Sequence, residues 1–215
     1  PVQPKETTVY IAPYDANQLY MSQTTSDGKK YDPSIEPRLD LYNEYFGGGM
    51  NSIVFQEMRE ARSLAYSAAA VMSSPGYKDD NYAFFTYIAT QNDKLDDALN
   101  GFEEIIEDMP QSQNAFNLAK DGLDSRLRTE RIIKDGVAWA YIDAQDLGET
   151  TDDRKELFEA LPTLTLDDIV KFQQDYVKGR TYNIAILGRV EDLDLDSLGK
   201  RGRVVLLTQD DIFGY

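Results

Sequence analysis

The sequence contains no cysteine and no histidine among its 215 residues. Without cysteine, the chain can form neither a disulfide nor a thiolate metal site, and it has no cysteine nucleophile. Without histidine, it can build neither a Ser-His-Asp triad nor a histidine zinc site, and no side chain titrates near neutral pH unless its surroundings shift its pKa. The chain by itself therefore carries none of these catalytic centres.

Long apolar runs and excess positive charge are missing as well. No apolar run approaches the roughly 20 residues of a membrane-spanning helix, and the opening PVQPKETTV lacks the basic and apolar regions of a signal peptide. With 38 acidic and 22 basic residues, the formal net charge is -16, which repels the phosphate backbone of nucleic acids. The segment 1–7, PVQPKET, is typical of an extended linker, so we expect a piece of a longer protein.

The order of predicted elements indicates the fold class. Strand patterns occur at residues 7–15, 17–25, 64–74, 81–91, 182–188 and 203–208, and the third and fourth form a predicted hairpin. Helical patterns occur at 37–46, 51–62, 95–109, from 113 to a break at 134–136, from there to 148, and at 152–161 and 165–178. Because the strands group around a block of helices without regular βαβ alternation, we expect an α+β fold with a largely antiparallel sheet covered by helices on one face.

Capping residues predict where two of the helices begin. Asp93 precedes an unbroken helical period that runs to Met109, and we expect it to be the N-cap of that helix. Thr165 and Asp168 have the spacing of a capping box, and Gly179 lies past the end of the same helix.

Three consecutive glycines, residues 47–49, raise the question of a phosphate site. The surrounding FGGGMNS lacks the lysine and Ser/Thr of a P-loop and does not match G-x-G-x-x-G. We therefore expect a helix-to-helix turn that needs positive φ and close backbone approach, which glycine tolerates.

Adjacent carboxylates are also frequent, at Glu103/Glu104, Asp152/Asp153, Asp167/Asp168 and Asp210/Asp211. Neighbouring residues of a helix point in different directions, so no such pair makes a shared acid-base site without a distant partner. We interpret these pairs as solvated faces and as helix N-terminal charges.

Two arginines in the segment FQEMREARSLAYSAAA, residues 55–70, lack partners on their own helix. Neither Arg59 nor Arg62 has a carboxylate three or four residues away, so both guanidinium groups are free to reach beyond the helix. The residues alone favour an ion pair with an acid elsewhere in the fold, and a contact with another molecule is the alternative.

The longer stretch YFGGGMNSIVFQEMREARSLAYSAAA, residues 45–70, resembles a segment in the C-terminal parts of M16 zinc metallopeptidases, relatives of pitrilysin, insulin-degrading enzyme and mitochondrial processing peptidase. The rest of residues 1–215 agrees more loosely with one M16 domain, and the ending DIFGY resembles that of large bacterial members. The resemblance implies homologous α+β domains that enclose a chamber, with the zinc motif H-x-x-E-H in the first domain. Because this chain has no histidine, it is expected to be a C-terminal, non-metal-binding domain that binds no cofactor, with zinc in the N-terminal half of the parent enzyme.

The resemblance also implies roles for individual side chains. Arg59 and Tyr66 correspond to an arginine and a tyrosine that the metal-free half supplies to substrate near the zinc, and Arg62 corresponds to a basic residue with a structural or secondary role. A tyrosine hydroxyl can donate to the oxyanion that develops on a scissile carbonyl, and an arginine can hold substrate carbonyls or carboxylates. The implied partners are peptide substrates and other M16 domains, of the same chain or of a zinc-bearing subunit, and the isolated chain is expected to be inactive.

A second interpretation is a non-catalytic M16-like subunit or scaffold that retains the arginine and the tyrosine without using them. A free-standing enzyme that works with carboxylates alone is the least supported class, because no acid pair has a motif around it. An upstream reading frame that contains H-x-x-E-H would favour the peptidase.

Overall fold

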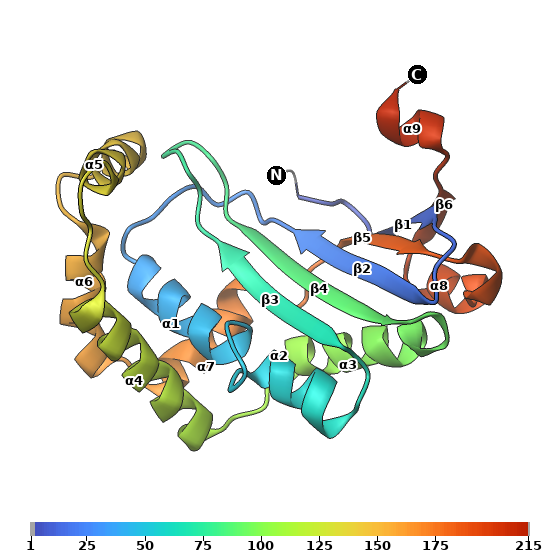
Figure 1. Cartoon of the computed structure of the whole chain (residues 1–215), viewed down its shortest axis with the longest axis horizontal. Helices are drawn as coiled ribbons and strands as arrows, with labels where there is room; N and C mark the ends of the chain where they lie inside the picture. The colour runs from blue at the N-terminus through green and yellow to red at the C-terminus, as the bar shows by residue number, and fades with distance from the viewer. Residues whose placement is uncertain (1–2, 215) are drawn as a thin grey trace.

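The computed structural model describes residues 3–214, which form one six-stranded sheet with helices packed on one face (Figure 1). The strands are β1 (Thr8–Pro13), β2 (Gln18–Thr25), β3 (Ser67–Ser73), β4 (Ala83–Gln91), β5 (Asn183–Gly188) and β6 (Arg203–Leu206). The predicted linker at 1–7 and the terminal motif DIFGY each extend beyond the described residues; positions 3–7 contain no helix or strand.

The helical elements are grouped between pairs of strands up to β4, and a block of helices separates β4 from β5, as the sequence pattern predicts. They are α1 (Glu36–Phe46), α2 (Ile53–Phe55), the π-helical turn η1 (Gln56–Ala61), the short turn η2 (Asn92–Lys94), α3 (Leu95–Glu107), α4 (Gln113–Thr129), α5 (Gly136–Leu147), α6 (Asp153–Ala160), η3 (Leu161–Thr163), α7 (Leu166–Tyr176), η4 (Val190–Asp192), α8 (Leu195–Arg201) and α9 (Gln209–Phe213). The segment that the sequence presents only as an acidic connector, 190–202, contains η4 and α8.

The sheet has the strand order β3-β4-β2-β5-β1-β6. The pairs β3–β4, β4–β2 and β2–β5 are antiparallel, whereas β1 runs parallel to both β5 and β6. The predicted α+β class, the largely antiparallel sheet and the β3–β4 hairpin are confirmed. The two parallel pairs arise because β1 lies between the two C-terminal strands and is separated from β2 by β5.

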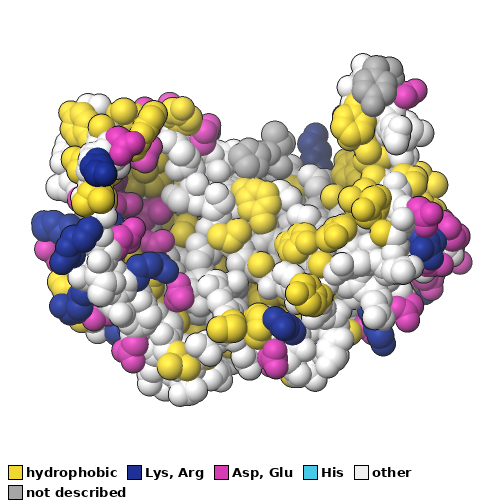
Figure 2. Space-filling view, viewed as in Figure 1, with side chains coloured by type: hydrophobic (Ala, Val, Ile, Leu, Met, Phe, Trp, Pro, Cys, Tyr) yellow, Lys and Arg dark blue, Asp and Glu magenta, His cyan; other side chains and the backbone are white. Residues whose placement is uncertain are grey.

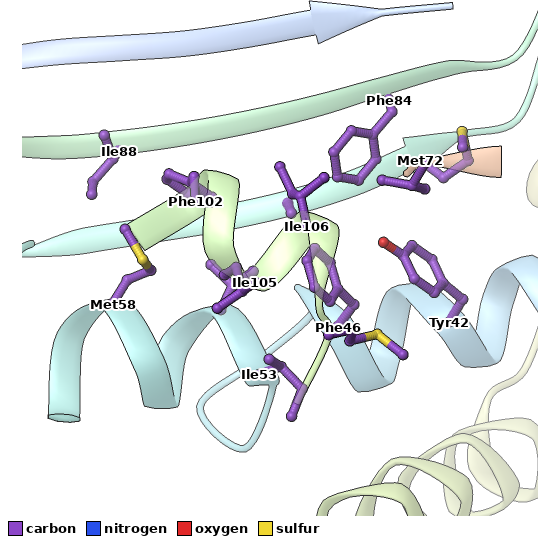
Figure 3. Close-up of a cluster of buried hydrophobic side chains, with 14 of the residues drawn as sticks. Tyr42, Phe46, Ile53, Met58, Met72, Phe84, Ile88, Phe102, Ile105 and Ile106 are labelled. Carbon is purple, nitrogen blue, oxygen red and sulfur yellow. The ribbon is translucent and has the colours of Figure 1, made fainter. Parts of the chain in front are cut away.

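The hydrophobic core lies between the sheet and the helices. Side chains alternate along each strand, so Phe84 and Ile88 of β4 point into the core while Tyr87 points to the opposite face. Figure 3 shows Phe84 above Phe46 of α1, and Ile88 near Phe102 of α3. The helices leave the other face of the sheet uncovered, and Figure 2 shows this side hollowed between the α5 and α9 ends of the molecule.

The two predictions about helix caps have different outcomes. Asp93 does not cap α3, because the chain enters that helix through the additional turn η2, which contains Asp93, and no side chain caps the helix itself. The capping box of α7 is confirmed: the amide of Thr165 donates to Asp168 Oδ2 over 2.8 Å, and the amide of Asp168 donates to Thr165 Oγ1 over 3.3 Å.

The glycine turn between α1 and α2 is explained by close approach alone. A Cβ on Gly47 would lie 1.9 Å from the carbonyl oxygen of Ala70 in β3, and one on Gly48 would lie 2.7 Å from the carbonyl oxygen of Asn43. None of the three glycines has a positive φ, so that part of the prediction is wrong. Gly47 is therefore required by the close approach of the end of α1 to the backbone of β3, and Gly48 by its close approach to the last turn of α1, whereas Gly49 has open space around it.

Candidate functional site

Arg59 lies on a π-helical turn. The helix begins conventionally at Ser52, whose hydroxyl accepts a hydrogen bond from the amide of Phe55, and then widens into η1. A π-helix closes hydrogen bonds five residues apart and is frequent at functional sites, because it changes which side chains share a face. Two residues beyond η1, Ser63 has a positive φ of 52° although it is not glycine. This left-handed residue turns the chain from η1 toward β3.

Tyr66 has a fixed backbone and an exposed side chain. Its amide donates to the carbonyl oxygen of Ala89 over 3.1 Å, and Thr90 Oγ1 donates to the carbonyl oxygen of Leu64 over 2.5 Å. These bonds attach the segment before β3 to β4. The side chain of Tyr66 nevertheless remains 79% exposed. A rigid backbone therefore presents a solvent-accessible phenol.

The structure brings Arg59 and Tyr66 together. The guanidinium carbon of Arg59 lies 5.9 Å from the centre of the Tyr66 ring and 4.9 Å from that of Phe55. Its Nε is 3.7 Å from a carboxylate oxygen of Glu60, and its side chain is 44% exposed. Cation–π contacts at exposed sites contribute only about 0.5–1 kcal/mol. The contact aligns the two side chains while leaving both of them accessible.

Arg62 forms an ion pair with an acid on another helix, as the residue pattern favours. Its Nη1 lies 2.6 Å from Glu104 Oε2 on α3, and its Nη2 lies 3.6 Å from Glu57 Oε2. Glu57 precedes Arg62 by five residues, a spacing that a π-helical turn brings onto one face and an α-helix does not. Hydrogen bonding to Glu104, the largest cause, raises the pKa of Arg62 above its usual value. Arg62 thus connects η1 to α3.

A hollow of about 570 Å³ lies beside Tyr66, at the end of the sheet where η1 and η2 meet it. It is lined by Asn17, Gln18, Ser63, Leu64, Ala65, Tyr66, Ala89, Thr90, Gln91 and Lys94. Its volume lies within the range of small-molecule and peptide sites. Side-chain amides, the hydroxyls of Ser63 and Thr90, and one ammonium group therefore line the hollow together with the Tyr66 phenol.

The uncovered face of the sheet is almost free of charge. Within the six strands, all of which lie in the described part of the chain, Arg203 on edge strand β6 is the one charged residue. Tyr20 lies 6.5 Å from Tyr14 and 6.4 Å from Tyr87, measured between ring centres. Partial burial, followed by the nearby Tyr20, raises the pKa of Tyr87. The sequence analysis missed this face, although strands without charge on either side are typical of sheets covered on both faces.

A second cluster of titratable groups lies at the N-terminal end of α1. Glu36, Asp40, Glu149 and Asp153 line a cavity of about 220 Å³ between α1 and the α5–α6 segment. The hydroxyl of Tyr82 donates to Glu36 and that of Tyr31 to Glu149, each over 2.5 Å. Burial, ahead of the charges of Asp40 and Glu149, raises the pKa of Glu36 to about 7. Burial and the charge of Asp153 raise the pKa of Asp40 to about 6.

No group of three or more acidic, histidine or cysteine side chains within residues 3–214 is arranged to hold a metal ion. The carboxylates at α1 therefore do not fit a metal centre. No helix of this same range is both long and apolar enough to cross a membrane.

Comparison with known families gives one match. The profile of a family described as the peptidase M16 inactive domain matches residues 1–123, and this range includes η1, Arg59 and Tyr66. Among curated protein sequences, none matches the chain.

Three solved structures illustrate the similarity of fold. The peptidase M16 inactive domain from Pseudomonas fluorescens has a TM-score of 0.70 and 16% identity, covering 88% of this chain and 45% of its own. The periplasmic protease PqqL from Escherichia coli has a TM-score of 0.64 and 13% identity, covering 86% of this chain and 20% of its own. A chain of complex III from Candida albicans has a TM-score of 0.64 and 15% identity, covering 93% of this chain and 50% of its own. At these identities the likeness concerns the fold alone, and the chain spans half or less of each of these proteins.

Proposed function

This chain belongs to the peptidase M16 inactive domain family, and we propose that it serves as the non-metal-binding domain of a zinc-dependent M16 peptidase, to which it supplies Arg59 and Tyr66 as substrate contacts. The proposal rests on one observation: Arg59 and Tyr66 form an exposed pair beside a backbone segment that is hydrogen-bonded to β4. Neither side chain is needed to fill the core, so both are available to another molecule.

The two side chains supply complementary interactions. The Tyr66 phenol donates a hydrogen bond to the negative charge that develops on the scissile carbonyl oxygen, and a positioned donor of this kind lowers the barrier by about 3 to 4 kcal/mol. The planar guanidinium of Arg59 holds a substrate carbonyl or carboxylate through paired N–H donors. The contact with the Tyr66 ring restricts the conformations of the Arg59 side chain, so less conformational entropy is lost when substrate binds.

The metal belongs to another domain in this proposal. The chain has no histidine, and its described carboxylates form no metal-binding group, so the residues present do not fit zinc. Zinc bound elsewhere would supply activation of the attacking water. Residues 1–215 act as a single domain, and the partner is a zinc-bearing M16 domain in the same protein or in a second subunit. The isolated chain is expected to be inactive.

Turnover of the assembled peptidase tests the roles of Arg59 and Tyr66. We expect Tyr66→Phe to lower kcat about 100- to 1,000-fold, the usual effect of removing an oxyanion donor, without changing the melting temperature. Arg59→Ala is expected to raise KM, because it removes a contact with bound substrate. Wild-type kinetics in both variants would exclude the pair from the reaction.

A non-catalytic subunit is the second candidate, and the similarity of fold to a complex III chain favours it. In that case the assembly that contains this chain would lack peptidase activity, and substitution of Arg59 and Tyr66 would leave the assembly intact. Purification of the native assembly followed by a peptidase assay distinguishes the two candidates.

A further inference from the structure

The register of the sheet creates an apolar groove on its uncovered face. Tyr20, Ala89 and Leu187 occupy one row across the strands, and Tyr10, Ser22, Tyr87 and Ala185 occupy the next. Small side chains thus sit between large ones, because Ser22 pairs directly with Ala185 while tyrosines flank them. The resulting groove has a volume of about 220 Å³.

The lining of the groove is apolar and carries no charge. It comprises Tyr10, Ala12, Tyr20, Met21, Ser22, Tyr87, Ala185, Ile186, Leu187 and Leu207. Its volume is below the 300–1,000 Å³ typical of pockets for drug-sized ligands, so one side chain of a larger ligand fits better than a whole small molecule. In Figure 2, hydrophobic side chains gather over the strands in the hollow between α5 and α9.

One row of paired residues relates the groove to the segment that carries Tyr66, although no residue lines both the groove and the hollow beside Tyr66. Ser67, the next residue, pairs with Ala89, and Ala89 pairs with Tyr20, so the three residues form one row across β3, β4 and β2. Neighbouring strands lie 4.7–4.9 Å apart, which places Tyr20 about 10 Å from Ser67. An extended peptide advances about 3.3 Å per residue. A peptide held at Tyr66 therefore reaches the groove within a few residues.

We propose that this groove is a substrate subsite that takes one apolar side chain, such as phenylalanine or leucine, of an extended peptide whose other part contacts Arg59 and Tyr66. The inference rests on the proposed function, since it names a feature of the peptide that the domain would bind. The tyrosines suit this occupant, because their rings pack on an apolar side chain while their hydroxyls can bond to the peptide backbone. A carboxylate side chain is excluded, because the groove offers no charged partner to replace its hydration.

Binding of labelled peptides to the whole 215-residue chain tests this subsite. Two uncharged Gly/Ser/Gln peptides of about ten residues, identical except for one Phe or one Asp, are titrated by fluorescence anisotropy. We expect the Phe peptide to bind at least about tenfold more tightly, as the burial of one aromatic side chain implies. Equal affinities, or no binding of either peptide at concentrations of about 1 mM, would overturn the subsite.

Variants of the groove test whether the peptide binds in this subsite or non-specifically to the apolar face of the sheet. Ala185→Leu fills the floor and Tyr87→Ser removes a wall, and each is expected to weaken binding of the Phe peptide about five- to tenfold without changing the Asp peptide. Val71→Ser is the matched control, because Val71 is 44% exposed on the edge strand β3 and does not line the groove. An equal loss in this control would contradict the proposal. The melting temperature of each variant confirms that it folds.

Two further outcomes distinguish this inference from the proposed function. If turnover depends on Tyr66 while Ala185→Leu leaves both turnover and peptide affinity unchanged, the groove is not a subsite and the proposed function stands. If Ala185→Leu weakens Phe-peptide binding while Tyr66→Phe and Arg59→Ala leave turnover unchanged, the groove binds peptide and the proposed function fails. If Ala185→Leu changes the sedimentation coefficient of the chain but leaves its affinity for the Phe peptide unchanged, this face is an interface between copies of the chain and the subsite is overturned.

Discussion

The guanidinium carbon of Arg59 lies 5.9 Å from the centre of the Tyr66 ring, although Arg59 lies in η1 and Tyr66 in the segment that precedes β3. The contact results from two local features, the π-helical turn that carries Arg59 and the left-handed Ser63 that turns the chain back toward β3. Both conformations are uncommon for non-glycine residues. Uncommon backbone conformations concentrate at functional sites, which motivates tests of this pair.

Removal of the Tyr66 side chain is expected to have little effect on folding. Tyr66→Ala should change the free energy of unfolding by less than about 1 kcal/mol, because the ring is 79% exposed and its contact with Arg59 is a surface cation–π pair. Urea denaturation measures this change. Tyr45→Ala serves as the control, since Tyr45 is buried and should cost about 3–5 kcal/mol. A large loss of stability in Tyr66→Ala would assign this tyrosine a structural role.

The glycine turn allows a matched comparison of two substitutions. Gly47→Ala should destabilise the fold by about 3 kcal/mol or more, because the new Cβ would lie 1.9 Å from the backbone oxygen of Ala70. Gly49→Ala should be close to neutral, because no atom lies within 4 Å of its Cβ position. Chemical denaturation of both variants gives the difference. Similar stabilities would contradict the close approach of α1 to β3.

The half-buried carboxyls at α1 predict that stability falls as pH rises. The folded-state pKa of Glu36 is raised to about 7 and that of Asp40 to about 6, so both carboxyls bind protons more tightly in the folded chain than in the unfolded chain. Stability from these groups is fully present below about pH 4 and is lost as the pH rises through 6 and 7, by up to about 3 kcal/mol for each carboxyl. Urea midpoints measured between pH 5 and pH 8 follow this loss.

The substitution Glu36→Gln tests whether Glu36 causes this loss of stability at higher pH. Glu36→Gln retains an oxygen that accepts from Tyr82 but cannot ionise, so it should flatten the decline above pH 6. The exposed acid Glu159 on α6 provides the control, and Glu159→Gln should retain the wild-type profile. A decline of the same size in Glu36→Gln would show that other groups cause it. The charged neighbours that bear on this pair are Glu149, Asp153 and Arg126.

Arg62 is expected to act on stability rather than on substrate. Arg62→Gln removes the ion pairs with Glu104 and Glu57 that connect η1 to α3, so its unfolding midpoint should fall slightly at low salt. The difference from wild type should shrink at about 1 M NaCl, where charges at the surface are screened. Arg59→Gln is the comparison and should show a smaller salt-dependent difference, because it removes only the longer contact of 3.7 Å with Glu60. Loss of turnover in Arg62→Gln at unchanged stability would place Arg62 in the site.

Much of the architecture could be predicted from local sequence patterns. Hydrophobic periodicity predicts the order of strands and helices, and the spacing of Thr165 and Asp168 predicts the capping box. The spacing of Arg59 and Tyr66, together with the family resemblance, identified the two side chains that the structure brings together. The prediction that Asp93 caps α3 is wrong, because the additional turn η2 moves the start of the helix. The residue pattern does not indicate this turn.

The sequence by itself determined the α+β class, the absence of a histidine or cysteine metal site in this chain, and the candidate pair Arg59 and Tyr66. Only the tertiary structure decided that Arg62 pairs with Glu104, that Gly47 faces the backbone of β3, and that Ser22 and Ala185 form the floor of a groove. The physical reason is the range of the interactions. Periodicity and capping act between neighbours in the chain, whereas strand register and helix crossing are set by packing between residues far apart in sequence.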